Sequence, residues 1–325
     1  MNDSIDGSDP AIAMVFPGQG SQSVGMLSGL AAAFHQVAET FEEASDILGY
    51  DLWELVGHGP AEDLSQTDRT QPAMLAAGVA VWRVWQEEGG PVPSLMAGHS
   101  LGEYTALVCA GALDYPEAVS LVAARGHCMQ DAVAPGGGAM AAILGLSDTA
   151  VAEVCSAAAA GEVVTAVNFN SPGQVVIAGH GGAVQRAMSL AKERGAKRAI
   201  QLPVSVPSHC ALMKPAAEKF TVRLQETVFN RAQIPVIRNV DAGAHENPDD
   251  IRTALQRQLY NPVQWVRTIE VIRDAGVTRF IEAGPGKVLA GLCKRIDKSL
   301  LALPVYDPET LAAALSDWGD RYVNE

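Results

Sequence analysis

The stretch "AGHSLGEYTAL", from Ala97 to Leu107, places Ser100 between Gly98 and Gly102 at the spacing G-x-S-x-G. This spacing is typical of a nucleophile elbow, in which a strand turns sharply into a helix and exposes a serine hydroxyl. Side chains at the two glycine positions would collide as the strand and the helix approach each other. An ordinary glycine-bounded turn explains the five residues equally well, because the chain contains 31 glycines. The rest of the sequence must decide between these readings.

Composition narrows the class of protein. With 325 residues, 48% of them hydrophobic, the chain can bury a large core in one or two domains. A net charge of -14 argues against general binding to nucleic acid or to an anionic membrane. The five cysteines form no C-x-x-C pair, which indicates free thiols and a cytoplasmic protein. The acidic start "MNDSIDGSDP" predicts a disordered lead-in rather than a signal peptide, and no apolar run reaches the length of a membrane span.

Strand and helix patterns alternate along the chain and predict an α/β fold. We expect a buried strand over residues 11–16, helices over 26–48 and 71–88, and a short strand leading to Ser100. After a hinge, "APGGGA", the order of patterns becomes β-α-β-β-α-β, which is typical of a ferredoxin-like subdomain. The sequence therefore predicts a core of residues 1–134 and 206–325, interrupted by an insertion over 135–205.

Two glycine-rich segments resemble cofactor loops but lack essential positions. "GHGGAV" at Gly179 does not complete the dinucleotide pattern, and "GPGK" at Gly284 lacks the first glycine and the Ser or Thr of a phosphate loop. No His or Cys cluster has zinc spacing. We therefore expect neither a cofactor nor a metal.

A serine nucleophile needs a base, and His209 is the best placed of the seven histidines. It ends the segment "QLPVSVPSH", in which Pro203 and Pro207 stiffen the chain before a new helix. His99 is adjacent to Ser100, but neighbours around a tight turn point in different directions. The alternative for His209 is a helix-capping or interface histidine.

A nucleophilic serine also needs donors for the developing oxyanion. One is expected at the backbone N–H of Leu101, the residue after the nucleophile, and the other near Gln19 in "PGQGSQ". The alternative for that loop is a simple strand–helix turn. Arg125 closes the apolar run "AVSLVAA" on the next helix, and a buried arginine requires an anionic partner such as a substrate carboxylate. A structural salt bridge, or exposure at the helix end, is the alternative.

Seven blocks now stand in order between about residues 15 and 294: "FPGQGSQ", "GHSLGEYTAL", Arg125, "NFNSPGQVVIAG", "SVPSHCALM", "RQLYNPVQW" and "EAGPGKVL". Together they resemble the bacterial malonyl-CoA:acyl-carrier-protein transacylases of fatty-acid synthesis. The resemblance covers nearly the whole chain and implies an α/β-hydrolase-like core with a ferredoxin-like insertion. It also implies transfer of malonyl from malonyl-CoA to the phosphopantetheine thiol of acyl carrier protein.

The resemblance assigns roles at the matching positions. It implies that Ser100 is acylated, that His209 is the base, and that the backbone carbonyl of Gln258 orients the histidine. Gln19 and Leu101 would form the oxyanion hole, Arg125 would hold the malonyl carboxylate, and Asn168 and Gln174 would line the pantetheine channel. Related domains of large synthases often carry Phe before the histidine where this chain has Ser208, so exclusion of methylmalonyl cannot be inferred from that position.

Basic residues form two local clusters in an otherwise acidic chain. Because the carrier proteins of this pathway are acidic, we expect docking at Lys197, Arg198, Lys294 and Arg295. The alternative is a solvated surface without a partner. Two rival functions remain, a serine hydrolase such as a thioesterase and a non-catalytic module that binds CoA or the carrier protein.

Overall fold

The larger sheet is parallel and carries β1 at its centre. In this computed structural model, residues 11–134, 136–204, 206–244 and 247–319 are described; the expected N-terminal lead-in and residue 135 of the expected hinge lie outside them. The strands stand in the order β7-β2-β1-β8-β9. In chain order they are β1 (Ile12–Phe16), β2 (Leu95–Gly98), β7 (Val236–Ile237), β8 (Arg279–Ala283) and β9 (Leu301–Val305).

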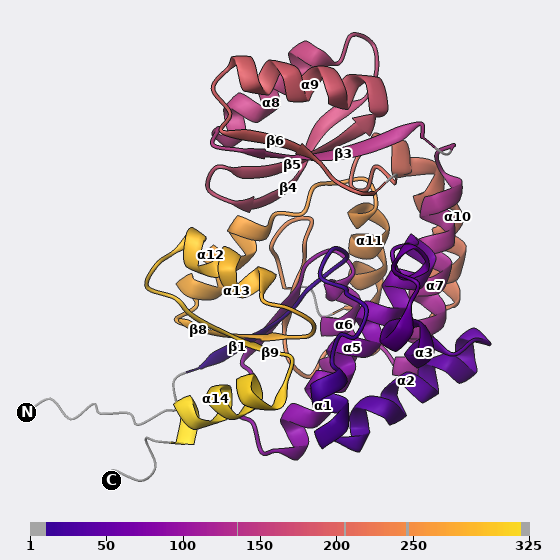
Figure 1. The fold of residues 1–325 in the computed structure, drawn as a ribbon, viewed down its shortest axis with the longest axis vertical. Coiled ribbons are helices and arrows are strands. Elements are labelled where there is room, and N and C mark those ends of the chain that lie inside the picture. Colours follow the sequence, from indigo (N-terminus) through magenta and orange to yellow (C-terminus); the bar gives the residue numbers. More distant parts are fainter. Residues whose placement is uncertain (1–10, 135, 205, 245–246, 320–325) are drawn as a thin grey trace, which may run out of the picture.

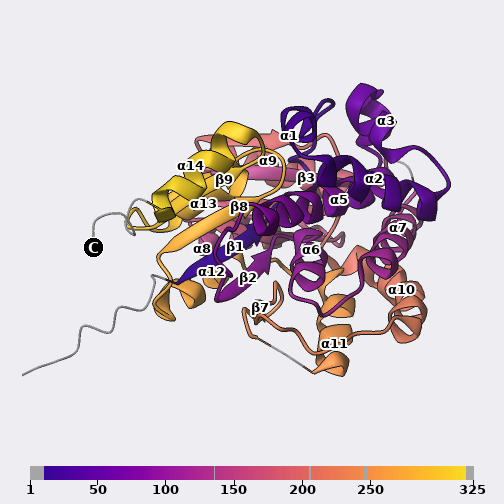
Figure 2. The ribbon, with the colours of Figure 1, turned by 90° about the horizontal axis from the view of Figure 1, so that it is seen from below.

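Helices cover both faces of this sheet (Figures 1 and 2). They are α1 (Ser28–Ala33), α2 (His35–Leu48), α3 (Leu52–His58), α4 (Ala61–Leu64), α5 (Thr67–Glu87), α6 (Gly102–Cys109), α7 (Tyr115–Asp131), α10 (Lys214–Glu226), α11 (Pro248–Gln258), α12 (Trp265–Asp274), α13 (Val288–Ile296) and α14 (Pro308–Gly319), with a 3-10 turn, η1 (Ala211–Met213).

Alternate residues of β1 enter different hydrophobic clusters, because successive side chains of a strand point to opposite faces. Met14 and Phe16 pack in the cluster that includes α5 and α6. Ala13 and Val15 pack in the cluster formed with α12 and α13. Burial on both faces explains why the strand is an uninterrupted apolar run rather than an alternating one.

The smaller sheet is antiparallel, with the strand order β4-β5-β3-β6. Its elements are β3 (Gly138–Leu144), α8 (Asp148–Ala158), β4 (Val164–Ser171), β5 (Gln174–His180), α9 (Gly181–Glu193) and β6 (Arg198–Gln201). The helices α8 and α9 cover one face of this sheet (Figure 1). The fold is therefore α/β, with one parallel and one antiparallel sheet.

Contacts from β4 join the two sheets. The backbone of Val263, just before α12, exchanges hydrogen bonds with β4: Phe169 donates to its carbonyl at 3.1 Å, and it donates to Val167 at 2.8 Å. Helices α12 and α13 also pack against β4, so they lie between the two sheets (Figure 1). The smaller sheet is thereby fixed over one end of the larger one.

One expected helix is divided. The sequence predicts a single helix over residues 26–48, but Phe34 is extended, with φ -133° and ψ 115°, and separates α1 from α2. The side chain of Phe34 packs against the main hydrophobic cluster. Tertiary packing thus overrides a local pattern that contains no Gly or Pro at the break.

Candidate active site

Ser100 lies at the sharp turn between β2 and α6, with a left-handed φ of 51°. A Cβ atom added to Gly98 would lie 1.8 Å from the carbonyl carbon of Gly102, and one added to Gly102 would lie 2.1 Å from the carbonyl oxygen of Phe16. No side chain fits at such distances, so both glycines are required by the close approach of α6 to β1 and β2. The turn has the geometry of a nucleophile elbow.

His209 contacts Ser100 directly. Its Nε2 lies 2.8 Å from the Oγ of Ser100, and its Nδ1 lies 2.7 Å from the backbone carbonyl oxygen of Gln258, the last residue of α11. A carbonyl only accepts hydrogen bonds, so the Nδ1 must carry the proton. The lone pair of Nε2 is then directed at the serine hydroxyl, which is the arrangement of a general base.

Burial keeps this histidine neutral. The pKa of His209 is lowered to about 3, mainly because the ring is removed from water, and secondly because the positive charge of Arg125 is close. Its side chain is only 2% exposed. Neutral imidazole, the form that can accept a proton, is therefore the resting state.

Two backbone N–H groups beside Ser100 are available to a ligand. In the described part of the chain, the N–H groups of Gln19 and Leu101 donate to no protein acceptor, and both residues line the same cavity. The N–H of Ser100 differs, because it donates to the Oδ1 of Asn239 at 2.7 Å. The two free donors are what an oxyanion hole requires.

Arg125, on α7, is 1% exposed and points toward the serine. Its Nη1 donates to Gln71 Oε1 at 2.8 Å, its Nη2 donates to Gln258 Oε1 at 2.9 Å, and the same Nη2 lies 3.5 Å from Ser100 Oγ. Among the described residues it forms no ion pair, and its Nε has no hydrogen-bond partner. The guanidinium also lies over the ring of Tyr104, with its Cζ 5.3 Å from the ring centroid. A buried guanidinium whose direct partners are uncharged retains its affinity for an anion.

A cavity of about 500 Å³ between the two sheets connects these groups. Its lining includes Gln19, Ser100, Leu101, Arg125 and His209 from the part with the larger sheet, and Met140 and Asn168 from the smaller one. The sequence-predicted nucleophile, base, donors and arginine therefore meet in one place.

Gln174, which we expect from the resemblance to line a pantetheine channel, is not among the residues that line this cavity. It begins β5, where its Oε1 accepts a hydrogen bond from Nη1 of Arg295 at 2.6 Å. Asn168, which shares the sequence block "NFNSPGQ", does line the cavity.

Three polar residues of the site were not identified from the sequence. Gln71 on α5 holds Arg125, and Glu103 and Asn239 lie behind Ser100, all of them buried. The signal for Glu103 was present, since a carboxylate within the apolar helical run "GEYTALVC" needs a buried partner. Gln71 and Asn239 carried no comparable signal.

His99 is occupied elsewhere. Its Nε2 lies 2.8 Å from Asn170 Oδ1, and its ring packs at 5.4 Å from the ring of Trp265. Within the described residues, no group of three or more His, Cys, Asp or Glu side chains is arranged to hold a metal ion. Nor does any helix in that part of the chain have the length and apolar character needed to cross a membrane.

Comparison with known proteins defines the class first. An acyl transferase domain model matches residues 13–311. The malonyl CoA-acyl carrier protein transacylase of Escherichia coli K12 is 59% identical over 303 residues, which cover 93% of this chain and 98% of that protein. The chain therefore belongs to the malonyl CoA-acyl carrier protein transacylase family of acyl transferases.

Solved structures agree in fold. The acyl carrier protein S-malonyltransferase of Vibrio cholerae is 60% identical, with a TM-score of 0.91 over 93% of this chain and 99% of that one. A malonyl-transacylase solved in complex with its type II polyketide synthase acyl carrier protein is 57% identical, with a TM-score of 0.93 over 94% and 99% of the two chains.

The low pKa of His209 predicts an unusual pH dependence. We expect the rate constant for phosphonylation of Ser100 by a fluorophosphonate to change less than about twofold between pH 5 and pH 8, because the base stays neutral throughout. The rate is measured by intact mass spectrometry, with Ser100→Ala as the background control. If the rate constant instead decreased as the pH was lowered, with a midpoint near pH 6.5, the ordinary pKa of histidine, the low pKa of His209 would be contradicted.

Proposed function

We propose that this protein transfers malonyl from malonyl-CoA to the phosphopantetheine thiol of acyl carrier protein, through a malonyl-Ser100 intermediate, in fatty-acid synthesis. The single observation that carries the proposal is the placement of Arg125 Nη2 3.5 Å from Ser100 Oγ, beside a serine–histidine pair at 2.8 Å. The family relationship supplies the two substrates.

The first half of the reaction loads the enzyme. The Ser100 hydroxyl gives its proton to Nε2 of His209 while its Oγ attacks the thioester carbon of malonyl-CoA. The N–H groups of Gln19 and Leu101 hold the oxyanion of the tetrahedral intermediate. When the carbon–sulfur bond breaks, Nε2 returns the proton to the CoA sulfur, and the malonyl group remains on the serine.

The second half is the same chemistry in reverse. The carrier-protein thiol gives its proton to His209 and attacks the malonyl-serine carbon, and the same N–H groups hold the oxyanion. Collapse breaks the bond to Oγ, which recovers the proton from Nε2. The carbonyl of Gln258 keeps the imidazole in one tautomer and one orientation through both halves.

Arg125 would select the acyl group. The malonyl carboxylate is one methylene away from the reacting carbon, so a guanidinium near Oγ can reach it once the ester forms. The carboxylate would replace the amide oxygens of Gln71 and Gln258 at the two terminal nitrogens of the guanidinium. An acetyl group has no carboxylate, so it cannot replace these acceptors of Arg125.

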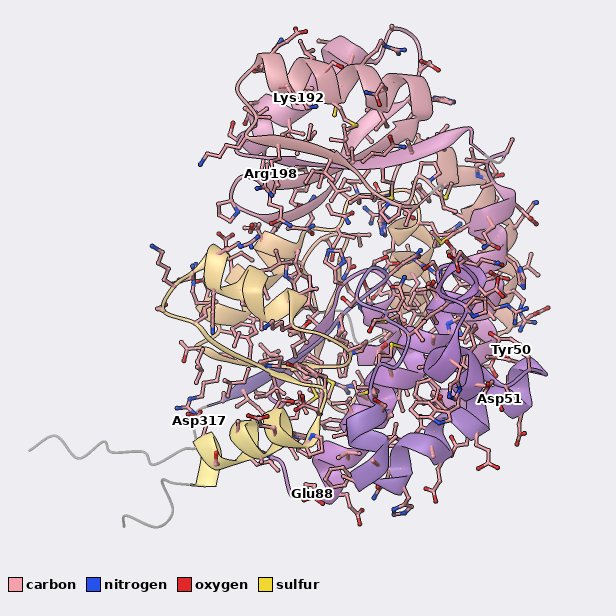
Figure 3. The ribbon with its side chains drawn as sticks, viewed as in Figure 1. Tyr50, Asp51, Glu88, Lys192, Arg198 and Asp317 are labelled. Atoms are coloured by element: carbon pink, nitrogen blue, oxygen red, sulfur yellow. The ribbon has the colours of Figure 1, made fainter. Side chains whose placement is uncertain are left out.

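The route of the pantetheine arm would pass Asn168, which lines the cavity on the side of the smaller sheet. Gln174 lies outside the cavity, next to Arg295, and would instead meet a macromolecule at the surface. The two basic clusters approach each other there. Leu144 of β3 pairs with Gln174 on one side and with Arg198, labelled in Figure 3, on the other. Because Gln174 bonds Arg295, Arg198 and Arg295 lie near the same end of the smaller sheet.

This basic edge is our proposed docking site for acyl carrier protein. Lys197, Arg198, Lys294 and Arg295 are all exposed. A chain with a net charge of -14 repels an acidic partner in general, so a local positive edge is needed for association.

The architecture has a proposed division as well. We assign residues 1–134 and 206–325 to an α/β-hydrolase-like core and residues 135–205 to a ferredoxin-like insertion. The parallel sheet with helices on both faces supports the first, and the order β4-β5-β3-β6 with two covering helices supports the second. Residues 135 and 205, at the boundaries, lie outside the described residues. A cytoplasmic location stays a prediction from the free cysteines.

The first test is covalent loading. Malonyl-CoA should add the mass of one malonyl group to the wild-type protein and none to Ser100→Ala. When holo acyl carrier protein is then added, the enzyme should lose this mass and the carrier protein should gain it. Intact mass spectrometry follows both chains. Loss of the mass to water, without gain on the carrier, would indicate a thioesterase, and no loading at all would favour a non-catalytic binding module.

The second test concerns the acyl group. Arg125→Ala should reduce serine acylation by malonyl-CoA by roughly 30- to 3,000-fold, because the carboxylate loses about 2–5 kcal/mol of pairing in a dry site. Acylation by acetyl-CoA should change little. Equal reductions for both donors in a folded variant would show that Arg125 is structural, so circular dichroism and the melting temperature serve as controls.

The third test concerns docking. We expect Arg198→Glu combined with Lys294→Glu to raise the KM for acyl carrier protein about tenfold or more and to leave the KM for malonyl-CoA unchanged. Lys219→Glu on α10 is the matched control, because it reverses an exposed charge away from the basic edge. Equal effects on both substrates would instead assign the edge to the CoA phosphates.

A further inference from the structure

The loop that follows β7 passes directly behind the nucleophile. Asn239, in this loop, is fully buried, and all its polar groups are used. Its Nδ2 donates to Gly98 O at 2.6 Å, and its Oδ1 accepts from Ser100 N at 2.7 Å. Its main-chain N–H donates to Glu103 Oε2 at 3.0 Å, and its main-chain oxygen accepts from Gln264 N at 2.9 Å.

The register of the sheet explains this bonding. Strands β2 and β7 pair in parallel, with Met96 opposite Val236 and Ala97 opposite Ile237, and Met96 N donates to Pro235 O. Two residues further along each strand, regular parallel pairing would join the main-chain N–H of Asn239 to Gly98 O and its carbonyl to Ser100 N. The side-chain amide, which has the same donor and acceptor as a peptide group, makes both bonds instead.

The bonds from the Asn239 side-chain amide matter because the backbone of Ser100 is strained. A left-handed φ of 51° is unfavourable for serine and persists only where the surroundings hold it. The ladder bond from Ser100 N to Asn239 fixes the peptide plane that precedes the serine. Without that bond a relaxed φ would turn Oγ away from His209.

The main-chain N–H of Asn239, which is thus free to bond elsewhere, connects the turn at Ser100 to the residue that orients His209. Glu103 Oε2 accepts from Asn239 N and also from Gln258 Nε2 at 2.9 Å, and Gln258 Nε2 donates to Ser100 O at 3.0 Å. Gln258 also supplies the carbonyl that orients His209. One buried carboxylate therefore holds both the residue behind the nucleophile and the residue behind the base.

We propose that Asn239 is a positioning residue, whose side-chain amide continues the β7 ladder past the end of the strand and holds Ser100 in its reactive conformation. The link to acyl transfer rests on the proposed function, but the positioning of Ser100 does not. Asn239 contacts neither the cavity nor any reacting atom, and it acts through the serine backbone.

The test uses a probe that needs the elbow but neither malonyl nor CoA. A fluorophosphonate is attacked at phosphorus by Ser100 Oγ, fluoride leaves, and His209 takes the proton. Asn239→Asp keeps the acceptor for Ser100 N but sets a carboxylate oxygen against Gly98 O. We expect its phosphonylation rate constant, and its kcat with malonyl-CoA, to fall about 10- to 100-fold, with KM changed less than threefold.

A matched control separates positioning from stability. Thr40→Val removes an equally buried hydroxyl on α2, which bonds Gln36 O and Arg83, and should lower the melting temperature without slowing phosphonylation. A folded Asn239→Asp protein that reacts at the wild-type rate would overturn the proposal. If wild type reacts with the fluorophosphonate but is not loaded by malonyl-CoA, the proposed function fails and the positioning role is still tested.

A measurement on the wild-type protein covers the case in which Asn239→Asp does not fold. The amide of Ser100, bonded to Asn239, should exchange its hydrogen at least about tenfold more slowly than the unbonded amide of Leu101. NMR with selectively labelled serine and leucine measures both rates. Equal exchange of the two amides would overturn the proposal.

Discussion

The hydrogen bonds of Gln258 are the interaction on which the site depends. Its carbonyl orients His209, its Oε1 holds Arg125, and its Nε2 bonds the backbone of Ser100 and the carboxylate of Glu103. It is fully buried at the last turn of α11. The main chain and side chain of this one neutral residue therefore set the relative positions of Ser100, His209 and Arg125.

A neutral carbonyl behind His209 has an electrostatic reason in this site. A carboxylate there would orient the imidazole equally well, but it would also pair with Arg125 and compete with an incoming anion. The buried carboxylate of Glu103 accepts a hydrogen bond from the amide nitrogen of Gln258 and is paired with Arg238, while Asn239 N donates to it. The guanidinium charge of Arg125 thus stays unpaired, and it contributes to the low pKa of His209.

Residue patterns predicted the α/β class and made Ser100, His209, Leu101 and Arg125 candidates, because each belongs to a local motif or to a charge in an apolar run. The family resemblance then grouped them in one site. Long-range contacts had no such signal. Nothing near Asn239 indicates that its side chain completes a strand, and nothing near Gln174 indicates that its hairpin turns away from the cavity. The division at Phe34 likewise depends on packing against residues far along the chain.

The topology of the larger sheet has a consequence for synthesis. Strand β1 lies between β2 and β8 in the sheet, and β8, which ends at Ala283, is made long after β1. The partners of the elbow, Asn239 and Gln258, also follow it by more than a hundred residues. During synthesis, neither the central sheet nor the hydrogen bonds around Ser100 can form until these later residues have left the ribosome.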